Sequence, residues 1–275
     1  MKKAMGLLMA VALVSAGCAV LDKGSKEEKI VETMVVWSVD LGDGISMEFM
    51  PIEPGSFRMG SENGDDDEKP VHEVTLTKPF WLAKTEVTQA QWRQVMGSNP
   101  SNFIGDTLPV EQVSWDDAME FCRKLTQMER QAGRLPEGYE YTLPTEAQWE
   151  YACRAGTTGD YATSTGSGQA GNLDAMAWYR ENSGSKTHPV GTKQANAWGL
   201  YDMHGNVWEW CLDWYWNYAS GNAVDPQGAS SGSRRVERGG SWCNIASYCR
   251  SAIRSHYSPG ITLNSLGFRP LVLQR

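Results

Sequence analysis

The sequence has little of what marks several common protein classes. Its 25 Lys and Arg face 33 Asp and Glu, giving a formal net charge of -8, and no basic stripe appears. We therefore expect no nucleic-acid partner. Its four histidines show no paired metal-ligand spacing, so the sequence gives no case for non-haem iron. A phosphate-binding Gly-rich loop with a Walker lysine is also missing.

Phenylalanine is scarce too, at six residues against twelve Trp, whereas Gly and Pro number 28 and 12. This balance favours a loop-rich fold whose buried area comes from indoles, and it argues against a helical bundle. The 275 residues are 41% hydrophobic and 21% charged, an ordinary globular balance with length for one sizeable core. We expect a single domain.

The N-terminal segment has the layout of a secretory signal peptide. Two lysines precede an apolar run over residues 4–14, which is too short to span a bilayer permanently, and small residues lead to Cys18. Those small residues resemble a lipobox, in which Cys18 is lipidated and anchors an exported protein in the cell envelope. The alternative is cleavage after Ala19 and a free secreted protein. The predicted division is a lipoprotein-type signal peptide over 1–18, a tether over 19–45 and a domain over 46–275.

Export would place the remaining cysteines in an oxidising compartment, where disulfides persist. Their number is odd, and the sequence does not decide which of them pair. Cys122 falls on the apolar face of a predicted helix and is interpreted as a buried small hydrophobe or a disulfide partner. The five are Cys122, Cys153, Cys211, Cys243 and Cys249.

Local patterns predict short strands and three capped helices. Apolar residues alternate over 47–59, around a turn, and again over 74–76. The loop over 61–69 carries four consecutive acidic residues without EF-hand spacing, which indicates a solvated surface loop. The predicted helix caps and closing glycines are Thr88 and Gly97, Ser114 and Gly133, and Thr145 and Gly156.

A series of short motifs runs in order over most of the chain. They include Met59-Gly60-Ser61, Glu86-Val87-Thr88, Leu143-Pro144-Thr145-Glu146, Gly205-Asn206-Val207-Trp208-Glu209, Arg238-Gly239-Gly240-Ser241 and Leu266-Gly267-Phe268-Arg269. The ordered set resembles the formylglycine-generating enzyme (sulfatase-modifying factor) family. That resemblance implies an α+β fold related to C-type lectins, low in regular secondary structure and stabilised by bound calcium.

The resemblance also implies a chemistry. Catalytic members hold copper(I) with two cysteines and use molecular oxygen to convert a cysteine in a sulfatase's Cys-x-Pro-x-Arg stretch to formylglycine. In this chain the corresponding residues would be Cys243 and Cys249, with Ser241 shaping the pocket and Arg250 or Arg254 supporting it. Copper(I) is soft and prefers thiolates, so two adjacent thiolates suit it.

The spacing of the pair argues against that chemistry. Catalytic relatives separate the two cysteines by four residues, whereas five lie between Cys243 and Cys249. If Tyr248 and Cys249 are matched to the family's Tyr-Cys, Asn244 takes the place of the first cysteine. A shift of one residue moves a ligand by ~3.3 Å in extended chain. The alternatives are a Cys243 to Cys249 disulfide, a Cys249 to Cys122 disulfide, or buried thiols.

Calcium ligands also follow from the resemblance. One site would use the carboxylates of Asp202 and Glu209, because a hard cation prefers oxygen ligands. The alternative for Glu209 is that it caps a turn or pairs with an arginine. The first predicted site comprises Asp202, Gly205, Val207 and Glu209, and the second comprises Asn172, Leu173, Asn182 and Gly184.

Two functions remain open from the sequence. The first is an envelope-anchored oxidase acting on a sulfatase-like Cys-x-Pro-x-Arg polypeptide. The second is a catalytically silent, calcium-stabilised module that recognises a peptide, a glycan or another envelope protein through its irregular C-terminal loops.

Overall fold

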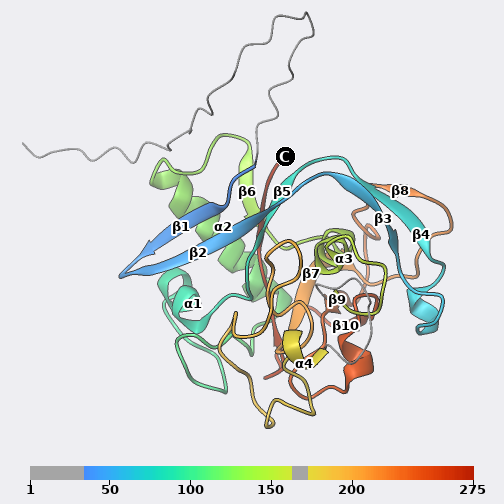
Figure 1. Cartoon of the computed structure of the whole chain (residues 1–275). Helices are drawn as coiled ribbons and strands as arrows, with labels where there is room; N and C mark the ends of the chain where they lie inside the picture. Colours follow the sequence, from blue (N-terminus) through green and yellow to red (C-terminus); the bar gives the residue numbers. More distant parts are fainter. Residues whose placement is uncertain (1–33, 163–172) are drawn as a thin grey trace, which may run out of the picture. The chain divides into compact units, whose positions relative to one another are not determined.

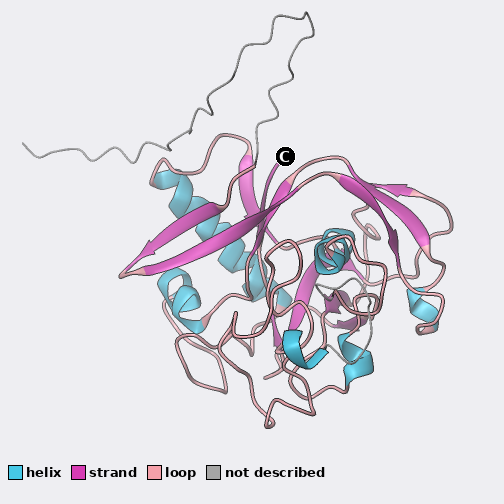
Figure 2. Cartoon of the chain, viewed as in Figure 1, coloured by secondary structure: helices cyan, strands magenta, loops and turns pink. Residues whose placement is uncertain are grey.

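The computed structural model describes residues 34–162 and 173–275, and from residue 34 onward they form one compact unit. Short strands in three sheets and a few helices are joined by long irregular loops (Figures 1 and 2). This is the α+β architecture with little regular secondary structure that the sequence predicted. Of the helices that the structure describes, none has the length and apolar character needed to cross a membrane.

The largest sheet consists of β1 (Trp37–Gly42), β2 (Ile45–Ile52), β5 (Phe80–Ala83), β12 (Leu271–Gln274) and β6 (Tyr139–Thr142), in that order and antiparallel throughout. Strand β12 therefore lies between two strands that precede it by more than a hundred residues. The sequence assigned residues 37–42 to the tether, but they pair with β2. Val39 and Leu41 on this strand are buried, which explains why it joins the sheet.

Two smaller sheets complete the fold. One contains β10 (Ser255–Tyr257), β9 (Arg235–Arg238), β7 (Trp208–Trp214) and β11 (Leu266–Gly267); the other contains β3 (Gly55–Met59), β4 (His72–Leu76) and β8 (Ala223–Val224). Strands β2, β3 and β4 confirm the alternating patterns predicted over 47–59 and 74–76. Strand β9 ends immediately before two glycines, so the following segment leaves the sheet there.

The helices are α1 (Gln89–Met96), α2 (Trp115–Gln131), α3 (Glu146–Arg154) and α4 (Leu173–Met176), with 3₁₀ turns at Asp66–Glu68 and Ala246–Cys249. The predicted caps are confirmed. The side chains of Thr88, Ser114 and Thr145 each accept a hydrogen bond from the backbone three residues on and form a complete capping box. Gly97 is the C-cap of α1 as predicted, whereas the C-caps of α2 and α3 are Ala132 and Ala155, each one residue before the predicted glycine.

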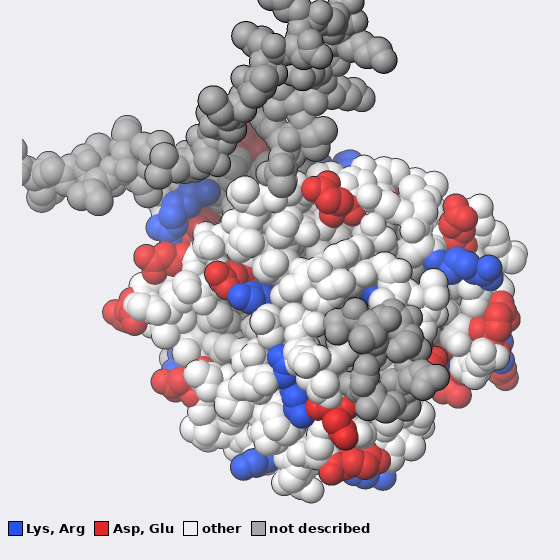
Figure 3. All heavy atoms as spheres, viewed as in Figure 1, with Lys and Arg blue, Asp and Glu red and all other residues white. Residues whose placement is uncertain are grey.

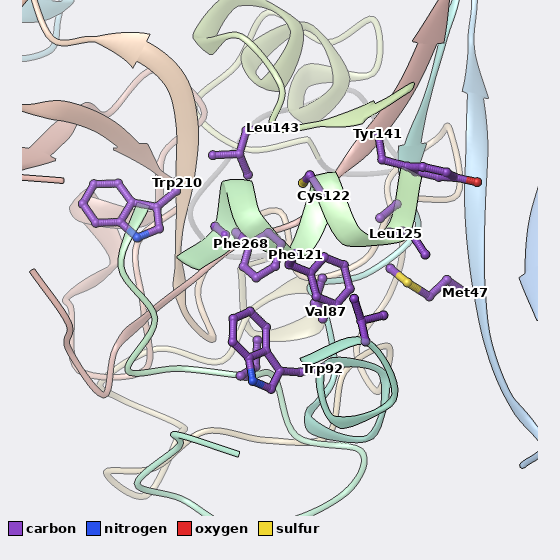
Figure 4. Packing of buried hydrophobic residues seen from close by; sticks show 14 of the residues in the cluster. Met47, Val87, Trp92, Phe121, Cys122, Leu125, Tyr141, Leu143, Trp210 and Phe268 are labelled. Carbon is purple, nitrogen blue, oxygen red and sulfur yellow. The ribbon is translucent and has the colours of Figure 1, made fainter. Parts of the chain in front are cut away.

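Aromatic side chains fill the core between α1, α2 and the five-stranded sheet (Figure 4). Trp92 stacks on Phe121 with ring centroids 5.6 Å apart, and Phe268 packs edge-on against Phe121 at 5.3 Å. Cys122 is buried among them, as a small hydrophobe, and Trp210 is fully buried. On the face drawn in Figure 3, acidic and basic side chains are interspersed.

Candidate functional site

The predicted catalytic residues lie on the segment that follows β9, residues 239–254. Gly239 and Gly240 have φ values of 100° and 76°, in the left-handed region that favours glycine. A Cβ added to Gly240 would lie 2.5 Å from the carbonyl oxygen of Tyr248 and 2.7 Å from the sulfur of Cys249. Glycine at this position therefore lets the segment fold back on itself and brings Cys249 against it.

Cys249 is shielded from solvent. Its exposed fraction is 0%, and it packs in an apolar cluster with Tyr161, Tyr179 and Leu173. Burial raises the pKa of the Cys249 thiol to about 12, and the charge of Glu181 acts in the same direction. At neutral pH this sulfur is therefore a protonated thiol.

Cys243 is half-buried and has different surroundings. Its sulfur lies 3.3 Å from the hydroxyl oxygen of Ser241. That hydroxyl also donates to the side-chain oxygen of Asn244 at 2.5 Å, and the same oxygen accepts a hydrogen bond from the indole of Trp208 at 3.0 Å. Ser241 thus fixes Asn244, the residue that takes the place of the family's first cysteine, and acts as a turn residue.

Of the three alternatives left open by the sequence, the structure has the buried thiol at Cys249, since all five cysteines of the described residues are free. Cys122 lies in the core beneath the five-stranded sheet, whereas Cys249 belongs to a separate apolar cluster. The sulfur of Cys243 contacts a hydroxyl group. The separate clusters of Cys122 and Cys249 are consistent with the absence of a disulfide between them.

Buried ion pairs connect the segment over residues 239–254 to acidic residues that are far away in the sequence. The guanidinium of Arg250 donates to both carboxylate oxygens of Glu68, at 2.9 and 2.6 Å. Arg254 donates to both oxygens of Glu146, at 2.6 and 2.8 Å. Glu68 is 0% exposed, so the prediction of a solvated acidic loop over 61–69 was wrong for this residue. Its burial is offset by Arg250.

Among the first set of predicted calcium ligands, Glu209 has other partners. Arg269 donates to both of its oxygens at 2.7 Å, and the indole of Trp149 donates to one of them at 2.8 Å. The arginine pairing considered from the sequence is therefore the arrangement that the structure has. Gly205 and Val207 are buried beside it.

Asp202 and Glu86 leave carboxylate oxygens without hydrogen-bond donors. One oxygen of Asp202 accepts from the backbone of Gly191 at 2.7 Å, but its other oxygen and both oxygens of Glu86 are buried without a partner among the described residues. Burial and the neighbouring Asp202 raise the pKa of Glu86 well above its ordinary value, and burial raises the pKa of Asp202 to about 6. Such orphaned oxygens are the kind of ligand that calcium takes.

Glu86 was not predicted as a ligand, since that prediction followed the motif around Glu209. Glu86 stands between the polar residues Thr85 and Thr88, so the sequence carried no signal that its carboxylate is buried and needs a partner.

The second set of predicted calcium ligands is engaged in local structure where it can be described. The side chain of Asn182 accepts from the backbone of Tyr179 and donates to a backbone carbonyl, each at 2.9 Å. Leu173 is buried in α4, and Gly184 lies in a turn with φ of 61°. Asn172, like Cys18 and the leader, lies outside the described residues. Where side chains are described, no group of three or more His, Cys, Asp or Glu could hold a metal ion.

Comparison with known proteins gives a consistent set of matches. A model described as the sulfatase-modifying factor enzyme 1-like domain matches residues 46–273. The chaperone protein LppX of Paenibacillus barcinonensis is 33% identical over 240 residues, which cover 72% of this chain and 79% of that protein. Treponema denticola variable protein 1 superposes with a TM-score of 0.79 at 32% identity, covering 88% of this chain and 100% of that structure.

Formylglycine-generating enzymes match over a smaller share of their own length. Those of Mus musculus and Streptomyces coelicolor are 34% and 37% identical, over 72% and 70% of this chain. The matches cover 52% and 60% of those two enzymes.

Proposed function

Because this chain belongs to the sulfatase-modifying factor (formylglycine-generating enzyme) family, we propose that it binds a partner polypeptide on that scaffold without oxidising it. The observation that carries the proposal is the burial of Cys249, whose side chain is 0% exposed and packs among Tyr161, Tyr179 and Leu173. Copper(I) is held by thiolates. With Asn244 at the neighbouring position, only the half-buried Cys243 remains, and these residues do not fit a two-thiolate copper site.

The relatives support a polypeptide as the ligand. LppX is named a chaperone protein, and a chaperone acts on other polypeptides. The partner we propose is a sulfatase-like protein with a Cys-x-Pro-x-Arg stretch, or another protein of the cell envelope. Attachment to the envelope through a lipid on Cys18 belongs to the same proposal. If the mass spectrum of the membrane fraction shows Cys18 without a lipid, the proposed attachment to the envelope is contradicted.

A direct assay separates this proposal from the oxidase. The reduced full-length chain is incubated with copper(I), oxygen and a Cys-x-Pro-x-Arg peptide, and the peptide mass is followed. We expect the cysteine mass to remain unchanged, because Cys249 is shielded from solvent and from the peptide. A catalytic relative serves as positive control. Conversion that is lost in Cys249→Ser would contradict the proposal and establish the oxidase.

Binding is measured independently of any chemistry. A reduced, carboxymethylated model protein, which stays unfolded, and a spotted library of short peptides serve as probes. We expect the full-length chain to bind the unfolded probe and a subset of the peptides, and Cys243→Ser together with Cys249→Ser to leave that binding unchanged. Absence of binding to both probes would overturn the proposed function.

We also propose that calcium stabilises the fold at Asp202 and Glu86, together with the carbonyls of Gly205 and Val207 that the family resemblance implies. When bound, the ion would supply positive charge to two buried carboxylates. At a calcium concentration about 100 times Kd, the free energy of unfolding should rise by about 2.7 kcal/mol. A thermal melt with calcium and then with a chelator measures this difference.

The matched variants for this test are Glu86→Gln and Glu48→Gln. Glu86→Gln should abolish the response to calcium, because it removes a ligand charge while preserving side-chain shape. Glu48 lies on the surface, paired with Lys84, so its substitution should leave the response intact. A melting curve that is unchanged by calcium and by chelator would remove calcium from the proposal.

A further inference from the structure

A cavity of about 390 Å³ lies beside the end of β7, and Arg254, the last residue of the segment 239–254, contributes to its lining. It is bounded by the end of β7, the loop over 215–229 and the start of α3. Its lining combines aromatic rings with polar side chains, the composition typical of binding pockets. Among the described residues, Ser241, Cys243 and Cys249 do not line it.

Trp216 lines this cavity with an exposed indole. Its exposed fraction is 67%, although large aromatic side chains are usually much more buried. Its backbone is nevertheless held in place. Arg254 donates to the carbonyl oxygen of Trp216 at 3.0 Å, and the hydroxyls of neighbouring Tyr215 and Tyr218 donate to Asp67 and Glu146 at 2.8 and 3.2 Å. An exposed ring on a fixed backbone is suited to contact a partner.

Asp213 supplies an acidic group in the same cavity. It is 5% exposed, and one of its oxygens accepts a hydrogen bond from the backbone of Glu146 at 2.8 Å. The other oxygen, Oδ1, accepts none from the residues that the structure describes. Gly228 faces that oxygen, and a Cβ added there would lie 2.7 Å from it, so glycine keeps this side clear. The nearby cation, Arg254, is paired with Glu146.

Two of the aromatic rings that line the cavity already contact cations. The guanidinium of Arg235 lies 3.4 Å from the ring centroid of Trp214, and that of Arg254 lies 4.0 Å from the centroid of Tyr218. Among the cation contacts of the described residues, none is made to the ring of Trp216. The cavity thus combines an aromatic face that carries no cation with the carboxyl group of Asp213, and both attract cations.

We propose that this cavity binds a basic side chain of the partner polypeptide, with its cationic group on Asp213 and its aliphatic stem along Trp216. The inference rests on the proposed function, and it adds which cavity contacts the partner and which kind of side chain that cavity binds. A formal net charge of -8 would attract basic segments toward this chain over longer distances. Burial and the neighbouring Glu146 raise the pKa of Asp213 to about 7, against the positive charge of Arg254, and a bound arginine or lysine would favour its ionised form further.

The test uses calorimetry on the full-length chain with three short peptides that differ at one central position. That position is arginine, lysine or citrulline, the last being a neutral isostere of arginine. We expect the arginine and lysine peptides to bind about 10- to 100-fold more tightly than the citrulline peptide, as a charge-assisted hydrogen bond predicts. Asp213→Asn should remove that preference while keeping an acceptor for the backbone of Glu146.

Trp216→Ala provides a second variant that leaves folding intact, since the indole is exposed. It should weaken binding of all three peptides, whereas Ile104→Ala, at another exposed apolar side chain, should change nothing. Equal affinity for arginine and citrulline, or unchanged binding in both pocket variants, would overturn the inference. If these variants still bound the unfolded model protein, the proposed function would stand. Binding of a disaccharide in place of the peptides, lost in Trp216→Ala, would assign the cavity to a glycan and overturn the inference.

Discussion

Arg238→Leu is expected to lower the free energy of unfolding by about 3–5 kcal/mol, the usual cost of breaking a buried ion pair. Arg238 is 0% exposed and pairs with Glu150, which is equally buried. Its guanidinium also donates to the backbone carbonyls of Ser251, Ala252 and Ile253, at 2.9, 2.9 and 2.6 Å. Leucine would leave those carbonyls without donors and Glu150 without this counter-charge.

Urea unfolding of the purified chain measures this effect. Arg123→Leu is the matched control, because Arg123 forms an exposed ion pair with Glu120 on α2. Such surface pairs contribute less than about 1 kcal/mol. A loss of similar size in the two variants would show that the buried pair contributes little to stability.

Glu209→Ala is expected to lower the free energy of unfolding by about 3–5 kcal/mol. The loss should be the same in the presence and in the absence of calcium. The substitution would leave the guanidinium of Arg269 buried without its carboxylate and the indole of Trp149 without its acceptor. From the sequence, Glu209 was predicted as a calcium ligand, for which the loss would depend on the ion. The contacts in the structure make it a partner of Arg269 instead.

Unfolding curves with calcium and with chelator distinguish these two roles. Glu140→Ala is a suitable control, because Glu140 pairs with the exposed Arg275 near the end of the five-stranded sheet. A Glu209→Ala loss that appears only when calcium is present would contradict the ion-pair role. It would restore the ligand role predicted from the motif.

The local elements of this fold could be predicted from the sequence. The capping boxes at Thr88, Ser114 and Thr145 are formed by hydrogen bonds that span three residues. All the residues of a capping box lie within four consecutive positions, so the sequence of that short segment is enough to predict it. The family motifs likewise carried the fold class, which the structural match at 32% identity bears out.

The charged contacts of the site could not be predicted in the same way. Glu68 and Arg250 are 182 positions apart, and Glu209 and Arg269 are 60 apart. Whether a carboxylate meets an arginine, a metal ion or water depends on which distant segments the fold brings together. The acidic loop illustrates this, since its run of charges indicates solvent exposure while the buried Glu68 is paired.

The cysteines show a second limit. A disulfide between Cys243 and Cys249 was one of the alternatives open from the sequence, but the turn at Gly240 buries Cys249 and leaves Cys243 half-buried. Burial and hydrogen bonding, which set the pKa of a thiol, depend on the packed environment and not on sequence separation.

The place of β12 between β5 and β6 has a consequence for synthesis. A chain that grows from its N-terminus can pair β1, β2 and β5 early, but the inner edge of β5 stays open until residues 271–274 have been made. During that interval the nascent protein displays an unpaired strand edge, which is a template for wrong association. The largest sheet is therefore completed only when β12 has been made and pairs with both β5 and β6.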